Sequence, residues 1–600
     1  MINVNMKENF LKRNEELKEE LRILQKKYST ISTLRIISFL SGAGLFIVGV
    51  ADALPVAGIF GVIFLLFFAY LIKVHSDVVN KTEVTESMLS VVDAYINRYD
   101  DGWRNFSKTG KEYLTSSDTV SSDLDLLGDN SLFQMICVAH TQKGVERLVE
   151  KMKLENIDIT DIPRRKEAIE ELSDMSEFAI EYEAAGIRLA NRKKKFKVEE
   201  FVKNFQADCA DGIPTWTNVA RVICPITFLV TLVLWIVGVC NYGVPLVTFL
   251  VILSFSWLTK TITDRILLPI NSAGYGAEDY LAMMEIIQSN EFNSSLLADI
   301  KEGVCGKNGG IKAFRKLSQL SQAYNISFNP LIHQVLSGVC LWDYQLCSVV
   351  GKWKKRYGKY VATSFEYIGE MEELLSLSVL GMIRKMGYSH IDEQEKEQVK
   401  LSCENLYHPL ILPETVVANS VNLNGGITII TGSNMSGKTT FLRTLAVNLA
   451  LAYMGAPICG DSLNASYMKI FTSMRVTDDV ANGISTFYAE ILRIKSMAEY
   501  KKENKPMICL IDEIFKGTNS ADRIVGATEA IKKLTGKGVM TLVSTHDFEL
   551  CNITDEYGNE ATNYHFEEYY ENDELKFDYK IKDGRCTTTN AMALLKMAGF

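Results

Sequence analysis

Two long stretches of almost uninterrupted apolar residues dominate the hydrophobic pattern of the chain. The first spans residues 36–72 and is broken only at 52–55, and the second spans residues 222–258 and is broken at 241–243. Each half is about long enough to cross a bilayer, since a transmembrane helix needs about 20 apolar residues. The pattern predicts two helical hairpins with four transmembrane crossings in all.

Basic residues flank these hairpins on their open sides and are absent from the short connections. The flanking residues are Arg35, Lys73, Arg221, Lys260 and Arg265. Because cytoplasmic loops carry an excess of Lys and Arg, both termini and every large segment are expected in the cytoplasm. A long, charged stretch precedes the first apolar run, which does not fit a signal peptide. We expect a multi-pass integral membrane protein, and a bacterial inner membrane fits this topology.

The alternative to membrane helices is a pair of buried core helices, but runs this long without charge are rare in a soluble core. The apolar runs also contain no Glu, Lys, Arg or His. Helices that conduct a substrate often need such groups, so these hairpins are interpreted mainly as an anchor.

The rest of the chain divides by its periodicity. Long helical patterns fill the segments outside the hairpins up to about residue 400, and short β-rich runs then alternate with helices, which is typical of a parallel α/β domain. The expected division is an amphipathic N-terminal helix (1–34), hairpin 1 (35–73), a first helical region (74–220), hairpin 2 (221–260), a second helical region (261–400) and an α/β domain (401–600).

Composition narrows the classes of protein. The chain has 600 residues, 47% of them hydrophobic, which excludes a disordered chain. Its net charge of −9 is a poor fit to a protein whose whole surface binds nucleic acid, although one local basic patch would suffice. The basic run 192–197 is interpreted as a solvated or lipid-facing helix surface in preference to a DNA contact. The 12 Cys include no C-x-x-C pair and are interpreted as reduced thiols rather than as a metal or disulfide framework.

A phosphate-binding loop is the strongest chemical signal. It follows an apolar strand at 427–431, precedes a helix, has the pattern G-x-x-x-x-G-K-T, and consists of Gly432, Ser433, Asn434, Met435, Ser436, Gly437, Lys438, Thr439 and the adjoining Thr440. Glycines let the backbone amides turn towards phosphates, and the helix N-terminus adds partial positive charge. The loop predicts ATP binding, with Lys438 on the β- and γ-phosphates and the Thr439 hydroxyl on Mg²⁺.

Two further strands end in polar side chains. The run 507–511 ends in Asp512 and Glu513, and the run 539–544 leads to His546. An Asp at this position suits the Mg²⁺ shell, and the adjacent Glu can polarise the attacking water. A His at the carboxyl end of a strand lies on the ligand side of a parallel sheet, where it can sense the γ-phosphate.

These motifs together resemble the ATPase domain of the MutS family, within the ABC-type ATPases. The resemblance covers residues 401–600 and rests on Asn434-Met435 inside the loop, on the stretch 474–487, on the D-E-x-x-x-G-T pattern from Asp512, and on T-H-x-F-E-L at 545–550. It implies a homodimer in which each nucleotide lies between two subunits. Ser485 and Thr486 then approach the γ-phosphate in the partner subunit's site.

The resemblance also assigns roles within the site. It implies that Glu513 is the catalytic base, Asp512 the magnesium-shell carboxylate and His546 the γ-phosphate sensor, alongside the catalytic Lys438. Asn419 belongs to the family's segment before the loop. The family has an aromatic residue near this position to pack on adenine, and Val416 stands there in this chain.

Upstream, the segment 123–133 with 141–144 and 162–169 resembles the start of the MutS core and lever region, so the second hairpin is inserted into that region. The expected fold is therefore an α/β P-loop (ABC-type) ATPase domain joined to an all-α MutS-like core and lever region, with four transmembrane helices in two hairpins. The chain shows no recognisable mismatch-reading domain, and the segment between hairpin 2 and the ATPase domain is short for levers plus a DNA clamp.

Three functions follow from these patterns. The first is a membrane-tethered MutS-like ATPase that switches between conformations, with DNA contact left open and mismatch-specific reading not expected. The second is an ABC-type transport ATPase fused to its own membrane domain. The third is a scaffold with an inactive site, which the intact Lys438, Thr439, Asp512 and Glu513 oppose.

Overall fold

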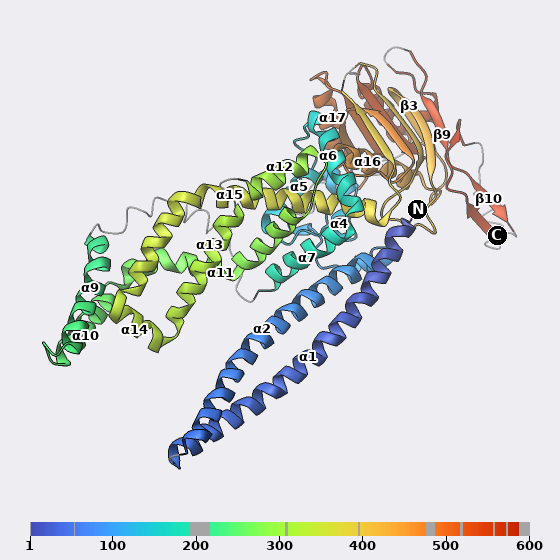
Figure 1. The fold of residues 1–600 in the computed structure, drawn as a ribbon. Helices are drawn as coiled ribbons and strands as arrows, with labels where there is room; N and C mark the ends of the chain where they lie inside the picture. The colour runs from blue at the N-terminus through green and yellow to red at the C-terminus, as the bar shows by residue number, and fades with distance from the viewer. Residues whose placement is uncertain are drawn as a thin grey trace.

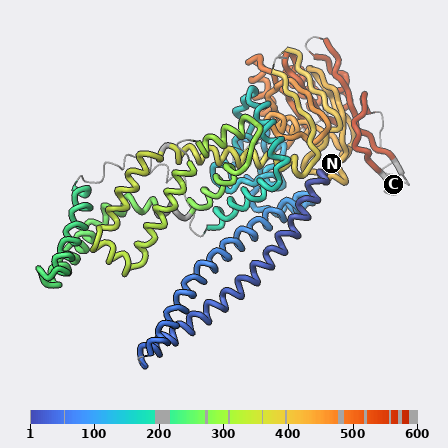
Figure 2. The backbone as a smooth tube through the Cα atoms, viewed as in Figure 1, coloured from blue at the N-terminus to red at the C-terminus, as the bar shows by residue number. Residues whose placement is uncertain are grey.

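A computed structural model gives the fold of the chain (Figures 1 and 2) and describes residues 2–52, 54–192, 216–306, 310–393, 397–475, 486–515, 520–555, 558–571 and 574–586. A sheet-containing domain lies at one end, and a set of helices extends from it. Two hairpins project from these helices, and their tips lie far from the sheets in the view of Figure 1.

The first hairpin consists of two long antiparallel helices, α1 (Val4–Ala51) and α2 (Pro55–Asn97). Their backbones approach closely at the tip, since a Cβ added to Gly49 would lie 2.3 Å from the nitrogen of Gly58. Large apolar side chains face outwards there, and Ile47 and Val50 are 64% and 69% exposed. The helix α1 runs without a break through residue 34, so the N-terminal amphipathic segment and the first apolar segment form one helix.

The second hairpin consists of α9 (Trp216–Ile236) and α10 (Gly243–Leu258). Three described helices, α1, α2 and α9, are long and apolar enough to cross a membrane. A fourth candidate is α10 together with the segment 260–270, to which it is joined by a bend of 66°. The four crossings predicted from the sequence thus correspond to three straight candidates and one bent candidate.

Two groups of helices connect the hairpins to the sheets. The helical core follows hairpin 1 and comprises η1 (Asp101–Asn105), η2 (Lys111–Tyr113), α3 (Thr119–Asp123), α4 (Leu132–Ile136), α5 (Gln142–Met152), η3 (Ile159–Asp161), α6 (Ile162–Asp174) and α7 (Ser176–Asn191). The levers follow hairpin 2 and comprise α11 (Lys260–Ser289), α12 (Ser295–Cys305), α13 (Gly310–Asn325), η5 (Ile326–Phe328), α14 (Pro330–Cys340) and α15 (Trp342–Ile383).

The longest lever, α15, joins the distant parts of the molecule. Its 42 residues span about 63 Å at 1.5 Å per residue. Near its beginning, Leu341 and Tyr344 pack with Ile252 of α10. At its other end the N-terminus of the chain is attached, because the Asn3 amide donates to the Ile383 carbonyl at 3.3 Å.

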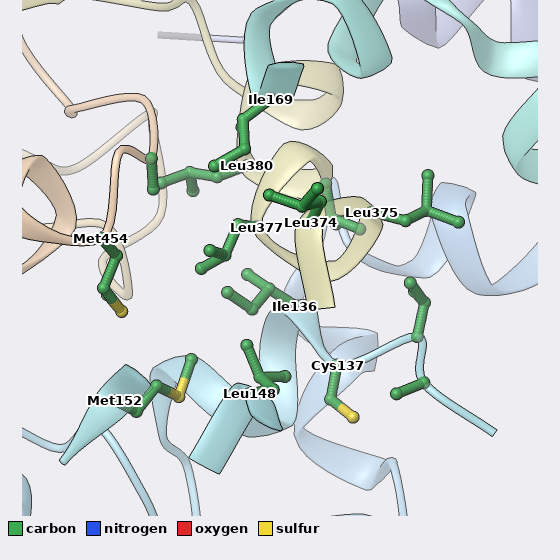
Figure 3. Packing of buried hydrophobic residues seen from close by; sticks show 14 of the residues in the cluster. Ile136, Cys137, Leu148, Met152, Ile169, Leu374, Leu375, Leu377, Leu380 and Met454 are labelled. Carbon is green, nitrogen blue, oxygen red and sulfur yellow. The ribbon is translucent and has the colours of Figure 1, made fainter. Parts of the chain in front are cut away.

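The last turns of α15 are buried between the helical core and the sheet domain. Figure 3 shows Leu374, Leu377 and Leu380 of α15 packed among side chains of both, including Ile136, Leu148, Met152, Ile169 and Met454. A buried ion pair joins Arg165 of α6 to Glu373, and the Arg165 Nε donates to the Met454 carbonyl at 3.0 Å. Three parts of the chain therefore meet in one core at this end of α15.

The sheet domain contains a six-stranded and a four-stranded sheet. The larger has the order β12-β9-β4-β8-β7-β6, and its strands pair in parallel except at β12. Its strands are β4 (Gly426–Thr431), β6 (Lys469–Ser473), β7 (Met507–Asp512), β8 (Val539–Thr545), β9 (Thr562–His565) and β12 (Lys582–Asp583). The smaller has the order β1-β5-β2-β3, with β1 (Tyr388–Asp392), β2 (Lys400–Leu406), β3 (Asn419–Asn424) and β5 (Ser462–Ser466).

Helices cover the larger sheet, and a short ribbon follows it. The remaining elements are α16 (Lys438–Tyr453), α17 (Thr486–Lys501), α18 (Ser520–Lys533), η6 (Phe548–Asn552) and the antiparallel pair β10 (Glu568–Glu571) and β11 (Glu574–Phe577). The strands β7 and β8 are buried at every residue, as expected for central parallel strands rich in Val, Ile and Leu. The strand β1 begins before residue 401, where the sequence placed the start of the α/β domain.

Candidate functional site

The loop between β4 and α16 has the geometry of a phosphate-binding loop. Gly432 and Gly437 have φ angles of 147° and 110°, which favour glycine. At Gly432 the lack of space also requires glycine, because an added Cβ would lie 2.5 Å from the Phe566 carbonyl oxygen. The next residue after Gly437 begins a 16-residue helix, so the free amides of its first turn face the loop. This arrangement attracts anions.

The side chain of Lys438 is buried and lies across the loop. Its Nζ atom donates to the carbonyl oxygens of Gly432 and Ser433 at 2.9 and 2.8 Å, and lies 3.4 Å from Nε2 of His546. The cation is thereby held at the centre of the loop, where the negative charge of a bound phosphate chain would lie.

Three oxygen-bearing side chains meet beside the loop. The Thr439 hydroxyl donates to Oδ2 of Asp512 at 2.9 Å, and the Ser544 hydroxyl donates to Oδ1 of the same carboxylate. Asp512 ends β7 and Ser544 lies in the adjacent β8, so the parallel register places both beside the first turn of α16. These oxygens are the type of ligand that Mg²⁺ prefers.

The next residue, Glu513, takes a left-handed backbone conformation with φ of 52°. This conformation is uncommon for residues other than glycine and is frequent at functional sites. The Glu513 amide donates to the Ser544 carbonyl at 2.9 Å, which holds the turn against β8. Its Oε1 atom lies 2.9 Å from Nε2 of His546, and the same nitrogen lies 2.7 Å from Oδ1 of Asn434. The carboxylate, the imidazole and the loop thus form one hydrogen-bonded group.

A cavity of about 280 Å³ opens beside the loop on the side of the smaller sheet. Asn419, Val416 and Thr440 line it, as do residues that the sequence did not single out: His408, Phe441, Phe566 and Tyr579. Its aromatic rings and its contact with Gly437 and Thr440 suit a flat base attached to phosphates in the loop. Burial lowers the pKa of His408 to about 4, so this imidazole is neutral at neutral pH.

Asn419 holds one wall of this cavity in place. Its side-chain amide donates to the Tyr579 carbonyl at 3.0 Å, and its Oδ1 accepts from the Ile581 amide at 2.9 Å. Tyr579 itself has a φ of 52°. Asn419 therefore positions the backbone that carries the tyrosine ring into the cavity wall, and Val416 contributes an aliphatic surface.

Comparison with known protein families identifies this region. Residues 428–600 match the family model described as MutS domain V. This C-terminal region therefore resembles MutS domain V. This domain is the ATPase domain of the MutS family, so the match supports a MutS-like protein and ATPase activity at the level of the family. The resemblance to the MutS family that the motifs predicted is confirmed over residues 428–600, while the helices and hairpins before residue 428 lie outside the match.

Some residues that the resemblance singled out lie outside the described part of the sheet domain. They are Ser485 and the segments 476–485, 516–519 and 587–600 that carry parts of the family motifs. Thr486 is described and begins α17. All the other predicted loop, carboxylate and histidine residues lie around the ends of β4, β7 and β8, within reach of one another.

The sheet domain is attached to the helical core by two carboxylates near the end of α3. Asp123 is fully buried and accepts from the backbone amides of Met474 and Arg475 at 3.0 and 3.2 Å and from Nη1 of Arg493 at 2.8 Å. Asp125 pairs with Arg475 and with Arg443, whose Nη1 lies 2.9 Å away. We call these two aspartates the aspartate latch.

The aspartate latch contacts residues on both sides of the segment 476–485 and on the helix that follows the phosphate-binding loop. Arg443 lies on α16 behind the loop, Arg475 directly precedes the segment 476–485, and Arg493 lies on α17 directly after it. The sequence placed 123–133 at the start of a MutS-like core but gave no role to these carboxylates. Their partners lie more than 300 residues away along the chain, and a single sequence carries no signal for such pairs.

Proposed function

We propose that this protein is a membrane-tethered MutS-type ATPase that binds and hydrolyses ATP to switch the arrangement of its levers and hairpins. The observation that carries the proposal is the convergence of Lys438, Thr439, Asp512, Glu513 and His546 at the carboxyl ends of adjacent strands in a MutS domain V. The candidate membrane-spanning helices belong to the same chain.

The chemistry follows from the position of each group. The loop amides and Lys438 bind the β- and γ-phosphates, because they present positive charge to the site. Oε1 of Glu513 accepts a proton from the attacking water, and Nε2 of His546 orients that carboxylate and contacts the γ-phosphate. The water oxygen would form a bond to the γ-phosphorus while the bond between that phosphorus and the β,γ-bridging oxygen breaks, so that ADP and inorganic phosphate leave.

The residues present also fit a magnesium ion. Thr439 and Asp512 supply hard oxygen ligands, and the buried Ser436 hydroxyl has no hydrogen-bond partner among the described residues. No group of three His, Cys, Asp or Glu side chains in the described part of the chain is placed to hold a metal alone. The remaining ligands would therefore be phosphate oxygens and water. When bound, Mg²⁺ neutralises charge on the phosphates.

We assign the cavity beside the loop to the adenine base. Tyr579 and Phe566 offer ring surfaces, while Val416 leaves an aliphatic wall where the family has an aromatic residue. The neutral His408 and the Asn419-held backbone line the same space. Aromatic surface from the C-terminal segment thus compensates for the valine.

We further propose a homodimer in which Ser485 and Thr486 complete the partner's site. This step rests on the MutS resemblance, and the position of Thr486 at the start of α17 is compatible with it. The aspartate latch connects both flanks of that segment to the helical core. A change in the site would therefore be passed to the core, which is packed on α15.

The output of the switch is a displacement of the two hairpins relative to each other. Hairpin 1 begins beside the sheet end of α15, and hairpin 2 packs at its other end. A rotation of α15 would move these attachments by different amounts. The apolar segments of the hairpins carry no Glu, Lys, Arg or His, so we propose an anchored switch rather than a transporter.

The decisive experiment is ATP turnover by the detergent-purified full-length protein, alone and with homoduplex or mismatched DNA. Magnesium-dependent turnover above that of Glu513→Gln is expected. Absence of turnover would contradict the proposal. A rate that changes with mismatched DNA alone would reveal a mismatch reader, an equal response to both duplexes would indicate general DNA contact, and indifference to DNA would direct the search to protein or lipid partners.

A further inference from the structure

The lever helix α14 has its large apolar side chains outside and its small ones inside. Leu331, Ile332 and Val335 are 77%, 49% and 55% exposed. Ser337 and Gly338 are buried, and a Cβ on Gly338 would lie 2.3 Å from Cε2 of Phe249, which places the two helices in close contact. Small residues at the helix contact and large apolar residues outside are typical of helices in lipid. In water the same surface would be an unfavourable exposed patch.

The apolar surface is continuous with that of hairpin 2. The helix α14 packs on α10 and also touches α9, and Phe328 just before it is 59% exposed. The side-chain amide of Gln345 donates to the Arg221 carbonyl at 2.7 Å, which joins the beginning of α15 to the first turns of α9. Any lipid around the outer faces of α9 and α10 would therefore also reach α14.

The segment is too short to span and has no charge of its own. Residues 317–342 contain no Asp, Glu, Lys or Arg. Eleven helical residues cover about 16 Å, roughly half of the hydrocarbon thickness of a bilayer. The only His in this segment, His333, lies 3.0 Å from Oδ2 of Asp343 and is turned towards α15. Such a helix suits the boundary between headgroups and acyl chains.

Basic side chains lie next along both flanking helices. Lys312 and Lys316 on α13 and Lys352, Lys355 and Arg356 on α15 are all exposed. Nε1 of Trp353 donates to the Ala313 carbonyl at 3.0 Å, so the two basic groups are level with each other. Between residues 310 and 365 the one acidic residue is Asp343, and it is paired with His333. We call these five side chains the basic collar.

We infer that α14 lies in the interfacial layer of an anionic bilayer beside hairpin 2, with the basic collar facing the lipid headgroups. This inference rests on the proposed membrane insertion of hairpin 2. Charge complementarity selects an anionic surface, because basic residues near such a membrane are attracted to it. The far end of the levers thereby contacts lipid through α14 as well as through hairpin 2.

The test places a photoreactive residue, p-benzoylphenylalanine, at Leu331 of the full-length protein in vesicles of phosphatidylcholine and phosphatidylglycerol. Leu250 on α10 serves as the positive site, and Tyr388, which is 76% exposed on β1, serves as the aqueous site. Lipid adducts detected by mass spectrometry are expected at Leu331 and Leu250 and not at Tyr388.

The outcomes separate this inference from the proposed membrane insertion. Adducts at Leu250 without adducts at Leu331 would overturn the interfacial position of α14 and leave the hairpin in the membrane. Absence of adducts at both sites would overturn membrane insertion itself. Crosslinking of Leu331 to a second protein chain instead of lipid would overturn the inference in favour of a protein interface.

The headgroup contact is tested by Lys352→Glu with Lys355→Glu and Arg356→Glu. The adduct yield at Leu331 is expected to fall at least about threefold in anionic vesicles and to stay unchanged in pure phosphatidylcholine. The matched control is Lys532→Glu with Lys533→Glu on α18 of the ATPase domain, which should leave the yield unchanged. Equal yields for the collar variant and the control in anionic vesicles would overturn the role of the basic collar.

Discussion

The sheet domain, which we call the nucleotide end, and the hairpins with α14 use apolar residues in opposite ways. In the sheet domain β7 and β8 are buried throughout, and the polar side chains gather where these strands end. In the hairpins and α14 the large apolar side chains face outwards, and glycines lie between the two helices of hairpin 1 and between α14 and α10. The first pattern suits a domain folded in water, and the second suits helices folded in lipid.

The difference shows where each end derives its stability. Fully burying one Leu or Ile side chain is worth about 1.5–3 kcal/mol, so the outward-facing side chains of the hairpins would be costly in water. The sheet domain is stabilised by its buried apolar residues, so its polar side chains at the strand ends are available for catalysis. The helical core, α15 and the aspartate latch are the parts through which the two ends can influence each other.

The largest expected effect is a loss of ATP binding at the nucleotide end with no change in the hairpins. Lys438→Ala should weaken ATP binding by roughly 100-fold or more, because losing one partner of a desolvated charge pair costs about 2–5 kcal/mol or more. Membrane insertion should be unchanged. Binding is measured by fluorescent-nucleotide titration of the purified full-length protein. Lys385→Ala, at a lysine whose side chain is 65% exposed, is the control and should bind like the native protein. Native affinity in Lys438→Ala would remove this lysine from the phosphate site.

The second effect separates binding from chemistry within the nucleotide end. Glu513→Gln should lower kcat by about 100-fold to 1,000-fold, since it removes the group that accepts the proton of the attacking water. ATP affinity should change by no more than about threefold, and bound ATP should persist and lengthen dimer lifetime. Rapid-quench experiments measure the turnover, and size-exclusion chromatography measures the persistence of the dimer. Glu529→Gln, at an exposed position on α18, should behave as native, and native turnover in Glu513→Gln would exclude the assigned role.

The third effect tests the connection between the ends. Asp123→Asn should destabilise the attachment of the sheet domain to the core by about 3–5 kcal/mol, because Arg493 loses its buried partner. Asp129→Asn lies on the same loop but breaks only an exposed pair with Lys111, worth about 0–1 kcal/mol. Thermal unfolding of the full-length protein in detergent compares them. Equal melting temperatures for the two variants would show that Asp123 does not stabilise the attachment of the sheet domain to the helical core.

The structure brings together the residues that the sequence singled out for a nucleotide site, because each of them lies at or near one of three strand ends. The loop 432–440, Asp512, Glu513 and His546 each follow an apolar run, and parallel pairing brings such ends together. The hairpins are equally predictable, because their signal is a continuous apolar run. The continuity of α1 through residue 34 is less predictable from the sequence. The pattern changes there from amphipathic to fully apolar, although the backbone helix has no break.

The contacts that the sequence could not predict join residues far apart along the chain. Tyr579 is held in the wall of the cavity beside the loop by Asn419, 160 residues earlier, and the aspartate latch pairs with arginines across more than 300 residues. No periodicity encodes such pairs. The segment around α14 contains a weak signal, the 26 uncharged residues at 317–342, but only the packing on α10 shows which of its faces is outside.

The smallest effect is a pH dependence confined to the nucleotide end. Burial holds the pKa of His408 at about 4, against an ordinary value of 6.5. Above pH 6.5 His408 is unprotonated in both the folded and the unfolded chain, so its titration does not lower the free energy of unfolding. As the pH falls from 6.5 towards 4, only the unfolded chain binds the proton, and stability falls by about 1.4 kcal/mol per pH unit. His408→Asn should remove this component of the loss.

The measurement compares melting temperatures at pH 7.5 and pH 5.0 for the native protein and His408→Asn. Other groups also titrate in this range, so the difference between the two proteins isolates the histidine. The native protein should lose more stability than the variant on acidification, and added ATP should not reverse the order, because the imidazole stays neutral in the cavity wall. Identical losses would mean that the imidazole is accessible to water, and the cavity would then be open on the His408 side rather than closed around a base.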